Sequence, residues 1–201
     1  LLTTASTWLS KTHSIKKLMQ NQLLPIHGAK AAIYLISSVI LKPGDEVLVP
    51  NPGYPMYWQV AATLGAKPVT YKVPYHSNDI LDLAEIEKLC TTNTRAIWIN
   101  TLQMPTGKVC SVDQLKHLIA FCKEKAIWLI NDNPYTAIAN AQVPDLSHQQ
   151  NSYKKSISII SLSKTFHIPG WRIAFILGVA ELIQQLRAHK NLLFTGHFSP
   201  F

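Results

Sequence analysis

A lysine in the C-terminal part of the chain has neighbours that favour covalent chemistry beside a phosphate site. Lys164 ends the segment 161–164, which reads Ser-Leu-Ser-Lys, directly after an apolar run, and Arg172 follows after a short loop. A lysine amine becomes nucleophilic when it is desolvated or lies near positive charge, and an arginine presents a planar fork of donors to phosphate oxygens. These residues indicate an imine-forming amine near a bound phosphate, although the short pattern by itself is common by chance.

A glycine at the start of a helical pattern is a second candidate. Gly28 stands between a short apolar run and a helical pattern that begins with Ala29 and Lys30. A glycine there lets backbone N–H groups approach an anion, and the helix dipole favours a phosphate at that end. A simple strand-to-helix turn has the same sequence, so both interpretations stay open at this point.

Two more candidates follow other apolar runs. Tyr54 lies in the rigid Pro- and Gly-containing turn 51–55, which presents its ring either to a planar ligand or to the protein core. Asp132 follows the apolar run 127–131 and precedes Tyr135 by a short turn. A carboxylate at the end of a buried strand is costly unless it is paired. Its alternative role is the N-cap of a helix.

Alternating apolar runs and amphipathic stretches predict the elements that position these residues. The runs are β-branched and almost fully apolar, which is typical of strands covered on both faces. We expect strands at 23–26, 46–50, 68–73, 96–100, 127–131, 156–160 and 173–177. We expect helices at 29–41, 54–64, 82–90, 111–125 (with Ser111 as its N-cap) and 179–189, and an additional helix over 8–20. This alternation predicts a three-layer, doubly wound α/β/α domain with a mostly parallel sheet of about seven strands. Ligands of such sheets bind at the carboxyl ends of the strands.

Composition narrows the class of protein. The chain has 201 residues, 47% of them hydrophobic, and a formal charge of +8. Its Lys and Arg residues are scattered, so we expect a solvated basic surface and a local phosphate site, without a nucleic-acid partner. The 3 cysteines lack CxxC spacing and the 8 histidines are dispersed. We therefore expect free thiols in the cytoplasm and no metal site. The sequence shows no signal peptide and no membrane-spanning run, and both ends have the appearance of cuts through a longer protein.

Four segments together resemble a known family. The segment SLSKTFHIPGWRIAF is similar to the SxSK…GxR segment of fold-type I pyridoxal-phosphate (PLP) enzymes, the class I/II aminotransferases. KPGDEVLVPNPGYPMY resembles their PGDEVLVPxPGYPxY, MPTGKVCS resembles NPTGxVxS, and NDNPYTAI resembles the segment that begins DExY. The matches occur in the family's order with its usual separations, which makes them far more specific together than any one alone.

The resemblance implies a role for each candidate residue. Lys164 would form a Schiff base with PLP and move the proton between the substrate Cα and the cofactor C4′. Asp132 would pair with the pyridinium nitrogen and keep the ring protonated as an electron sink. Tyr135 would donate a hydrogen bond to the phenolic oxygen, and Tyr54 would stack on the ring. The phosphate is expected beside Gly28, at the backbone amides of Ala29 and Lys30, the hydroxyls of Ser161 and Ser163, and Arg172.

The sequence departs from the family pattern at two positions of this site. Met104 stands where the family has the asparagine of NPTG, and a thioether cannot donate a hydrogen bond to the phenolic oxygen. Asn133, followed by Pro134, stands where the family has the glutamate of DExY. The paired MPTG and DNPY variants resemble a branch of the family that also has a DSGxF-like stretch, similar to residues 195–198 here.

The resemblance favours an aminotransferase that moves an amino group between an amino acid and a 2-oxo acid, as a homodimer. The whole of 1–201 is then the PLP-binding large domain. The N-terminal arm and the C-terminal small domain, with its arginine for the substrate carboxylate, are expected outside this chain. A PLP-dependent lyase or decarboxylase on the same fold is one alternative. The other is the aminotransferase-like sensor domain of a transcription regulator, which a winged helix upstream of Leu1 would reveal.

Overall fold

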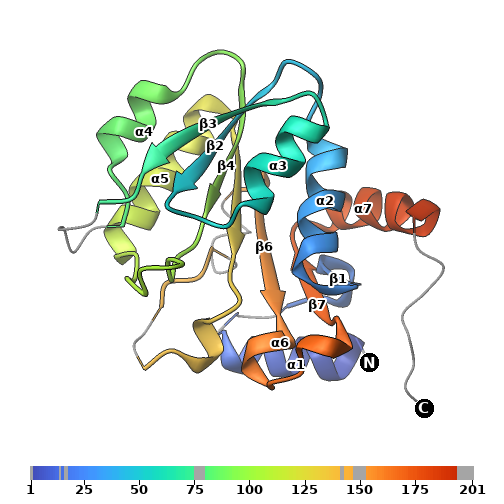
Figure 1. Ribbon diagram of the computed structural model, residues 1–201. Helices are drawn as coiled ribbons and strands as arrows, with labels where there is room; N and C mark the ends of the chain where they lie inside the picture. Colours follow the sequence, from blue (N-terminus) through green and yellow to red (C-terminus); the bar gives the residue numbers. More distant parts are fainter. Residues whose placement is uncertain are drawn as a thin grey trace.

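A seven-stranded sheet forms the centre of the molecule (Figure 1). The computed structural model describes residues 2–13, 15, 18–74, 80–140, 143–146 and 153–193. The strands are β1 (Leu23–Ile26), β2 (Glu46–Asn51), β3 (Lys67–Lys72), β4 (Thr94–Ile99), β5 (Trp128–Asp132), β6 (Ser156–Ser161) and β7 (Ala174–Leu177). Their order in the sheet is β1-β7-β6-β5-β4-β2-β3. Only the pairs that involve β7 are antiparallel, so the sheet is mostly parallel, as predicted.

Helices cover both faces of this sheet (Figure 1). They are α1 (Leu2–Thr12), α2 (Gly28–Ile40), α3 (Met56–Thr63), α4 (Leu83–Leu89), α5 (Val112–Lys125), the short α6 (Leu162–Thr165) and α7 (Ala180–Leu193). Short 3₁₀ turns lie at Gln20–Gln22, Thr136–Ile138 and Pro169–Trp171. Helices α2, α3 and α7 share one hydrophobic core, while α4, α5 and α1 pack on the other face. The three-layer α/β/α prediction is therefore confirmed. None of the described helices is long and apolar enough to cross a membrane.

Alternation along the strands divides the core between the two faces. In β4, Ala96 and Trp98 belong to the core beneath α2 and α3, and Ile97 and Ile99 belong to the core beneath α4 and α5. Successive side chains of a strand point to opposite faces, so burial on both faces requires a continuous apolar run. The continuous apolar runs of the sequence are therefore explained by burial of the strands on both faces.

Local sequence signals predicted the ends of most helices to within a few residues of the observed bounds. Helix α5 begins after Ser111, whose hydroxyl accepts a hydrogen bond from the Gln114 backbone, while the Ser111 backbone N–H donates to the side-chain oxygen of Gln114. This capping box satisfies donors that the first turn leaves unpaired.

The helix expected over 8–20 was misplaced, because α1 spans Leu2–Thr12. Ala5 and Leu9, one turn apart, bury against β1, β6 and β7, and this tertiary packing outweighs the low helix propensity of the Thr-rich start. Residues 195–198 lie outside the described part of the chain.

Candidate active site

A cavity of ≈ 310 Å³ lies at the carboxyl ends of the central parallel strands, where the start of α2 meets α6. Every residue that we predicted for the site lines it except Gly28, which lies directly before Ala29 at the helix start. Those lining residues are Ala29, Lys30, Tyr54, Asp132, Tyr135, Ser161, Ser163, Lys164 and Arg172. Met104, Tyr57, Asn100, Pro134 and Pro169 also line it. The sheet edge therefore brings together residues that the sequence spreads over more than half of the chain.

Strand alternation determines which polar residues reach this cavity. Ile130 and Trp98 point to the α2/α3 face of the sheet. Asp132 and Asn100, two positions further along their strands, therefore point to the same face. Asn131 and Asn133 flank Asp132 and must point to the opposite face. A single shift in register would exchange these groups.

Asp132 is buried and only half satisfied. Its Oδ2 accepts a 2.8 Å hydrogen bond from the Tyr57 hydroxyl, while Oδ1 is buried with no hydrogen-bond partner among the described residues. Desolvation raises the pKa of Asp132 to about 6, and the hydrogen bond from Tyr57 lowers the pKa in opposition. A buried carboxylate oxygen without a donor is costly. A buried carboxylate oxygen without a donor is expected of a residue that binds a cationic or N–H-bearing ligand. Because Asp132 ends β5 and accepts from Tyr57, its alternative role as a helix N-cap is not the one observed.

The start of α2 and Arg172 form one corner of the site. Gly28 has φ +82°, and a Cβ built on it would lie 2.4 Å from a guanidinium nitrogen of Arg172. Arg172 itself has a left-handed backbone with φ 52°, a conformation that costs energy for a non-glycine residue. The guanidinium therefore lies close against the first turn of α2, whose backbone N–H groups have no intrahelical partners. Together they make a cationic, donor-rich corner suited to a phosphate.

Helix α6 holds the lysine. Ser161 is its N-cap, with its hydroxyl accepting a hydrogen bond from the Ser163 backbone at 3.3 Å. This local role does not depend on a ligand, whereas the predicted role of Ser161 requires its hydroxyl to donate to a phosphate. The hydroxyl can do both, since it has one donor and two acceptor positions. Lys164 follows in the same single turn and is exposed to the cavity.

Two proline-containing loops carry Tyr54 and Met104 toward the cavity. Gln103, which is buried, links them by donating from Nε2 to the Pro52 carbonyl at 2.8 Å and to its neighbour's carbonyl at 2.6 Å. Its Oε1 accepts from the backbone and hydroxyl of Thr106. The Tyr135 hydroxyl lies 3.9 Å from the Met104 sulfur, which is a weak acceptor. Tyr135 therefore retains its capacity to donate to a ligand.

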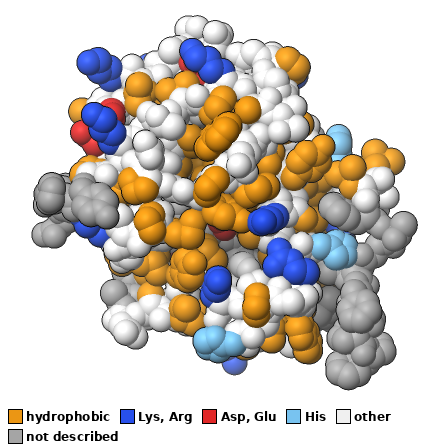
Figure 2. Space-filling view, in the orientation of Figure 1, with side chains coloured by type: hydrophobic (Ala, Val, Ile, Leu, Met, Phe, Trp, Pro, Cys, Tyr) orange, Lys and Arg blue, Asp and Glu red, His pale blue; other side chains and the backbone are white. Residues whose placement is uncertain are grey.

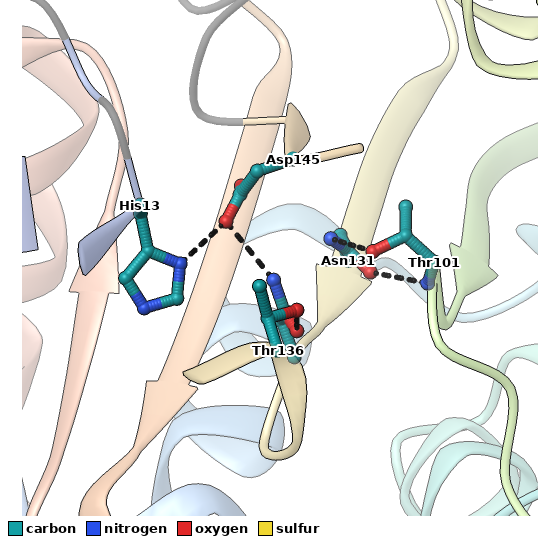
Figure 3. A network of polar contacts seen from close by, with 6 residues as sticks. His13, Thr101, Asn131, Thr136 and Asp145 are labelled. Atoms are coloured by element: carbon teal, nitrogen blue, oxygen red, sulfur yellow. Dashed lines mark hydrogen bonds and ion pairs between the residues drawn. The ribbon is translucent and has the colours of Figure 1, made fainter. Parts of the chain in front are cut away.

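The opposite face of β5 is braced by a polar network (Figure 3). Asn131 and Thr101 exchange two hydrogen bonds of 3.1 and 3.2 Å. Asn133 donates to Asp145 at 3.0 Å, and the same carboxylate oxygen contacts His13 Nδ1 at 2.8 Å. Asn133 also accepts from the Thr136 hydroxyl. An asparagine can donate to Asp145, whereas the glutamate of the family pattern would oppose one carboxylate to another. The departure at Asn133 thus matches its surroundings.

Sequence reasoning did not assign Tyr57 and Asn100 to the site. Tyr57 belongs to the PGYPMY segment, and Asn100 is the polar residue that ends an otherwise apolar strand. Both features are visible in the sequence. Their meaning depends on the contact between α3 and the ends of β4 and β5, which a local pattern does not specify.

The fold and the site define the class of protein, and comparisons with known proteins agree. The model of the family "Aminotransferase class I and II" matches residues 2–200, and the chain belongs to this family, whose members depend on PLP. Among its relatives, LL-diaminopimelate aminotransferase of Natranaerobius thermophilus is 30% identical over 94% of this chain and 52% of its own length. Transaminase BacF of Bacillus subtilis is 33% identical over 85% of this chain and 43% of its own length.

Solved structures resemble the fold closely. An aromatic aminotransferase from Pyrococcus horikoshii superposes with a TM-score of 0.87 at 26% identity, over 95% of this chain and 52% of that chain. A PLP-dependent aminotransferase from Streptococcus suis gives a TM-score of 0.82 at 26% identity, over 92% of this chain and 48% of that chain. The chain spans about half the length of the relatives that it matches.

Proposed function

We propose that the chain is the PLP-binding large domain of an aminotransferase that moves an amino group between an amino acid and a 2-oxo acid. The observation that carries this proposal is the buried Oδ1 of Asp132. It lacks a partner among the described residues and belongs to a side chain that lines the same cavity as Lys164 and Arg172. A carboxylate for a ring nitrogen, an amine for a carbonyl and a donor-rich corner for a phosphate together fit PLP. The relatives named above are themselves aminotransferases.

Each residue of the cavity has a part in this proposal. Bound PLP supplies a ring that withdraws electrons from the substrate Cα. Asp132 keeps the ring nitrogen protonated, and Lys164 holds the cofactor and moves a proton at the substrate Cα. Tyr135 donates to the phenolic oxygen and Tyr54 covers the ring face. The phosphate is bound by the start of α2 beside Gly28, by Ala29 and Lys30, by Ser161 and Ser163, and by Arg172.

Covalent attachment through Lys164 is the direct test of this function. The full-length protein that contains this chain should be yellow when it is saturated with PLP, because Lys164 lines the same cavity as Asp132 and its amine would form a Schiff base with the cofactor. Reduction with borohydride followed by peptide mapping should place the adduct on Lys164. Labelling of another lysine, or of none in the saturated sample, would exclude the assignment. A half-reaction screen against amino acids then separates amino transfer from elimination and decarboxylation.

We further propose that the intact protein is a cytoplasmic homodimer that comprises this large domain, a small domain and an N-terminal arm. In the view of Figure 2, hydrophobic side chains gather over the face on which α2 and α3 lie. Tyr34 and Trp58, on these helices, are 40% and 48% exposed. None of the three cysteines, all of which lie in the described part of the chain, forms a disulfide bond, which supports a reducing compartment. Light scattering at micromolar concentration should give twice the chain mass. A fully active monomer would contradict the dimer.

Restoring the family's asparagine at Met104 should change the electronics of the site. Hydrogen bonds to an ionised oxygen favour its charged form, and the Met104 thioether supplies none. We expect Met104→Asn to shift the visible absorption titration of the PLP-loaded protein to lower pH. The two proteins should be titrated side by side, with Met104→Leu as the control that keeps the bulk and adds no donor. Coincident curves for Met104→Asn and wild type would mean that Met104 only packs in the turn.

A further inference from the structure

One residue outside the predicted set, Tyr57, forms a hydrogen bond with the Asp132 carboxylate. The Tyr57 side chain is 1% exposed, and its hydroxyl donates to Asp132 Oδ2 at 2.8 Å across 75 residues of sequence. The other carboxylate oxygen, Oδ1, is buried without a partner among the described residues. One oxygen is therefore held by the protein and the other is left for a ligand.

We propose that Tyr57 is a positioning residue for Asp132: its hydroxyl holds one oxygen of the ionised carboxylate so that the other faces the ring nitrogen of PLP. This inference rests on the proposed function, because it assumes that PLP occupies the cavity. It assigns to Tyr57 a role that acts through Asp132, without contact to the reacting atoms.

A hydrogen-bond chain gives the Tyr57 hydroxyl its direction. Asn100 Nδ2 donates to the Asp132 carbonyl at 2.8 Å and to the Tyr57 oxygen at 3.0 Å. A carbonyl oxygen can only accept, so the amide nitrogen of Asn100 must face it, although Asn100 Oδ1 then has no partner among the described residues. Since the Tyr57 oxygen already accepts from Asn100, its single proton is free to point at Asp132. The two hydrogen bonds therefore point the same way: Asn100 donates to Tyr57, and Tyr57 donates to Asp132.

Packing holds the Tyr57 ring in place. The ring stacks on Trp98 with centroids 4.7 Å apart and an interplanar angle of 11°. The Tyr54 ring also contacts it edge-on, with the ring centroids 5.7 Å apart. Tyr57 thus contacts both the carboxylate proposed for the ring nitrogen and the aromatic side chain proposed for the ring face. Trp98 lies in β4, and Asn100 follows the strand directly and points to the same face of the sheet. Both residues that hold Tyr57 are therefore positioned by the sheet.

The charge on Asp132 responds to this hydrogen bond. Burial raises the pKa of Asp132, and the Tyr57 hydroxyl lowers that pKa because it binds the charged form. The other titratable or charged side chains that line the cavity are Lys30, Tyr54, Tyr135, Lys164 and Arg172. All of them stay unchanged when Tyr57 is replaced by phenylalanine, which keeps the stacked ring and removes only the hydroxyl.

A matched pair of hydroxyl deletions tests the proposal. Tyr71 is also 1% exposed and its hydroxyl donates at 2.8 Å, but to the Trp98 carbonyl, away from Asp132. Tyr57→Phe and Tyr71→Phe should be made in the full-length protein. In the PLP-free form, the titration of the Asp132 carboxyl carbon is followed by ¹³C NMR and assigned with Asp132→Asn. In the PLP-loaded form, ¹⁵N-labelled cofactor reports the protonation of the ring nitrogen.

We expect Tyr57→Phe to raise the pKa of Asp132 by about one to two pH units. The ring-nitrogen signal should move toward neutral pyridine, because a more basic carboxylate takes the shared proton. Tyr71→Phe should leave both readings at their wild-type values. Coincidence of Tyr57→Phe with wild type in both readings would overturn the proposal, and so would equal changes in the two variants.

The inference and the proposed function fail in different ways. If the protein takes up no PLP, the proposed function is wrong, and the ¹³C titration still tests the contact between Tyr57 and Asp132. If PLP binds but neither reading moves, only the role of Tyr57 is wrong. Should Tyr57→Phe not fold, Asn100→Ala removes the donor that directs the hydroxyl. It should move both readings the same way by a smaller amount, and unchanged readings would again overturn the proposal.

Discussion

Replacing Asp132 by alanine is expected to slow the amino-transfer half-reaction by about two to four orders of magnitude while some PLP is still bound. Removing the partner of a buried cation costs about 3–5 kcal/mol, and each 1.4 kcal/mol or so in the barrier is about tenfold in rate. The corner formed by Gly28 and Arg172 is untouched by the change, so cofactor retention should suffer less than the chemical step. Single-turnover kinetics of the PLP-loaded protein measure the effect. Asp113→Ala, at a side chain that is 96% exposed, is the control. Activity within threefold of wild type would remove Asp132 from the proposed role.

The same carboxylate should destabilise the protein when PLP is absent. Burial raises the pKa of Asp132 from 3.8 to about 6, so the folded state binds more protons than the unfolded state between these values. Stability then falls as the pH rises from about 4 to 6 and stays lower above that range. Asp132→Asn, which has no such titration, should make the PLP-free protein more stable at pH 8 by about 1–3 kcal/mol. Urea unfolding of both proteins at pH 4 and pH 8 measures the difference in their free energies of unfolding. The same difference at both pH values would show that titration of Asp132 is not its cause.

Replacing Gly28 by alanine is expected to weaken PLP binding by about ten- to a hundredfold. The positive φ of +82° costs an alanine about 1–2 kcal/mol. The new Cβ would also lie 2.4 Å from the Arg172 guanidinium, which must then move away from the start of α2. Both donors proposed for the phosphate are disturbed at once. Titration of the PLP-free protein with PLP, followed by absorbance, gives the dissociation constant.

Gly44 offers a matched control for this change. Its φ is +88°, close to that of Gly28, but apart from its own chain neighbours no described residue has a heavy atom within 4 Å of a Cβ built on it. Gly44→Ala should therefore lose a similar amount of stability from backbone strain and keep the wild-type affinity for PLP. If both variants bind PLP equally well, the close approach of Arg172 to α2 has no part in phosphate binding.

Much of the fold and of the site follows from local features of the sequence. Fully apolar, β-branched runs predict strands buried on both faces, and the Ser111 capping box begins a helix without help from distant residues. Lys164 and Asp132 each follow such a run, and the carboxyl ends of parallel strands meet at one edge. The sequence could therefore place both residues in one cavity before any contact between them was known.

Only the tertiary structure decided how these residues are arranged within the cavity. The hydrogen bond between Tyr57 and Asp132 joins α3 to the end of β5, and the close approach of Arg172 to Gly28 joins the segment between α6 and β7 to the start of α2. Such contacts depend on strand order, register and the face to which each side chain points, and residues distant in sequence determine these. Long-range packing also explains why the position of α1 was not predicted. Its polar start is a poor helix former, and it becomes helical because Ala5 and Leu9 pack on the sheet. Local propensity and periodicity thus placed the chemical groups at the sheet edge, and long-range packing determined which of them face one another.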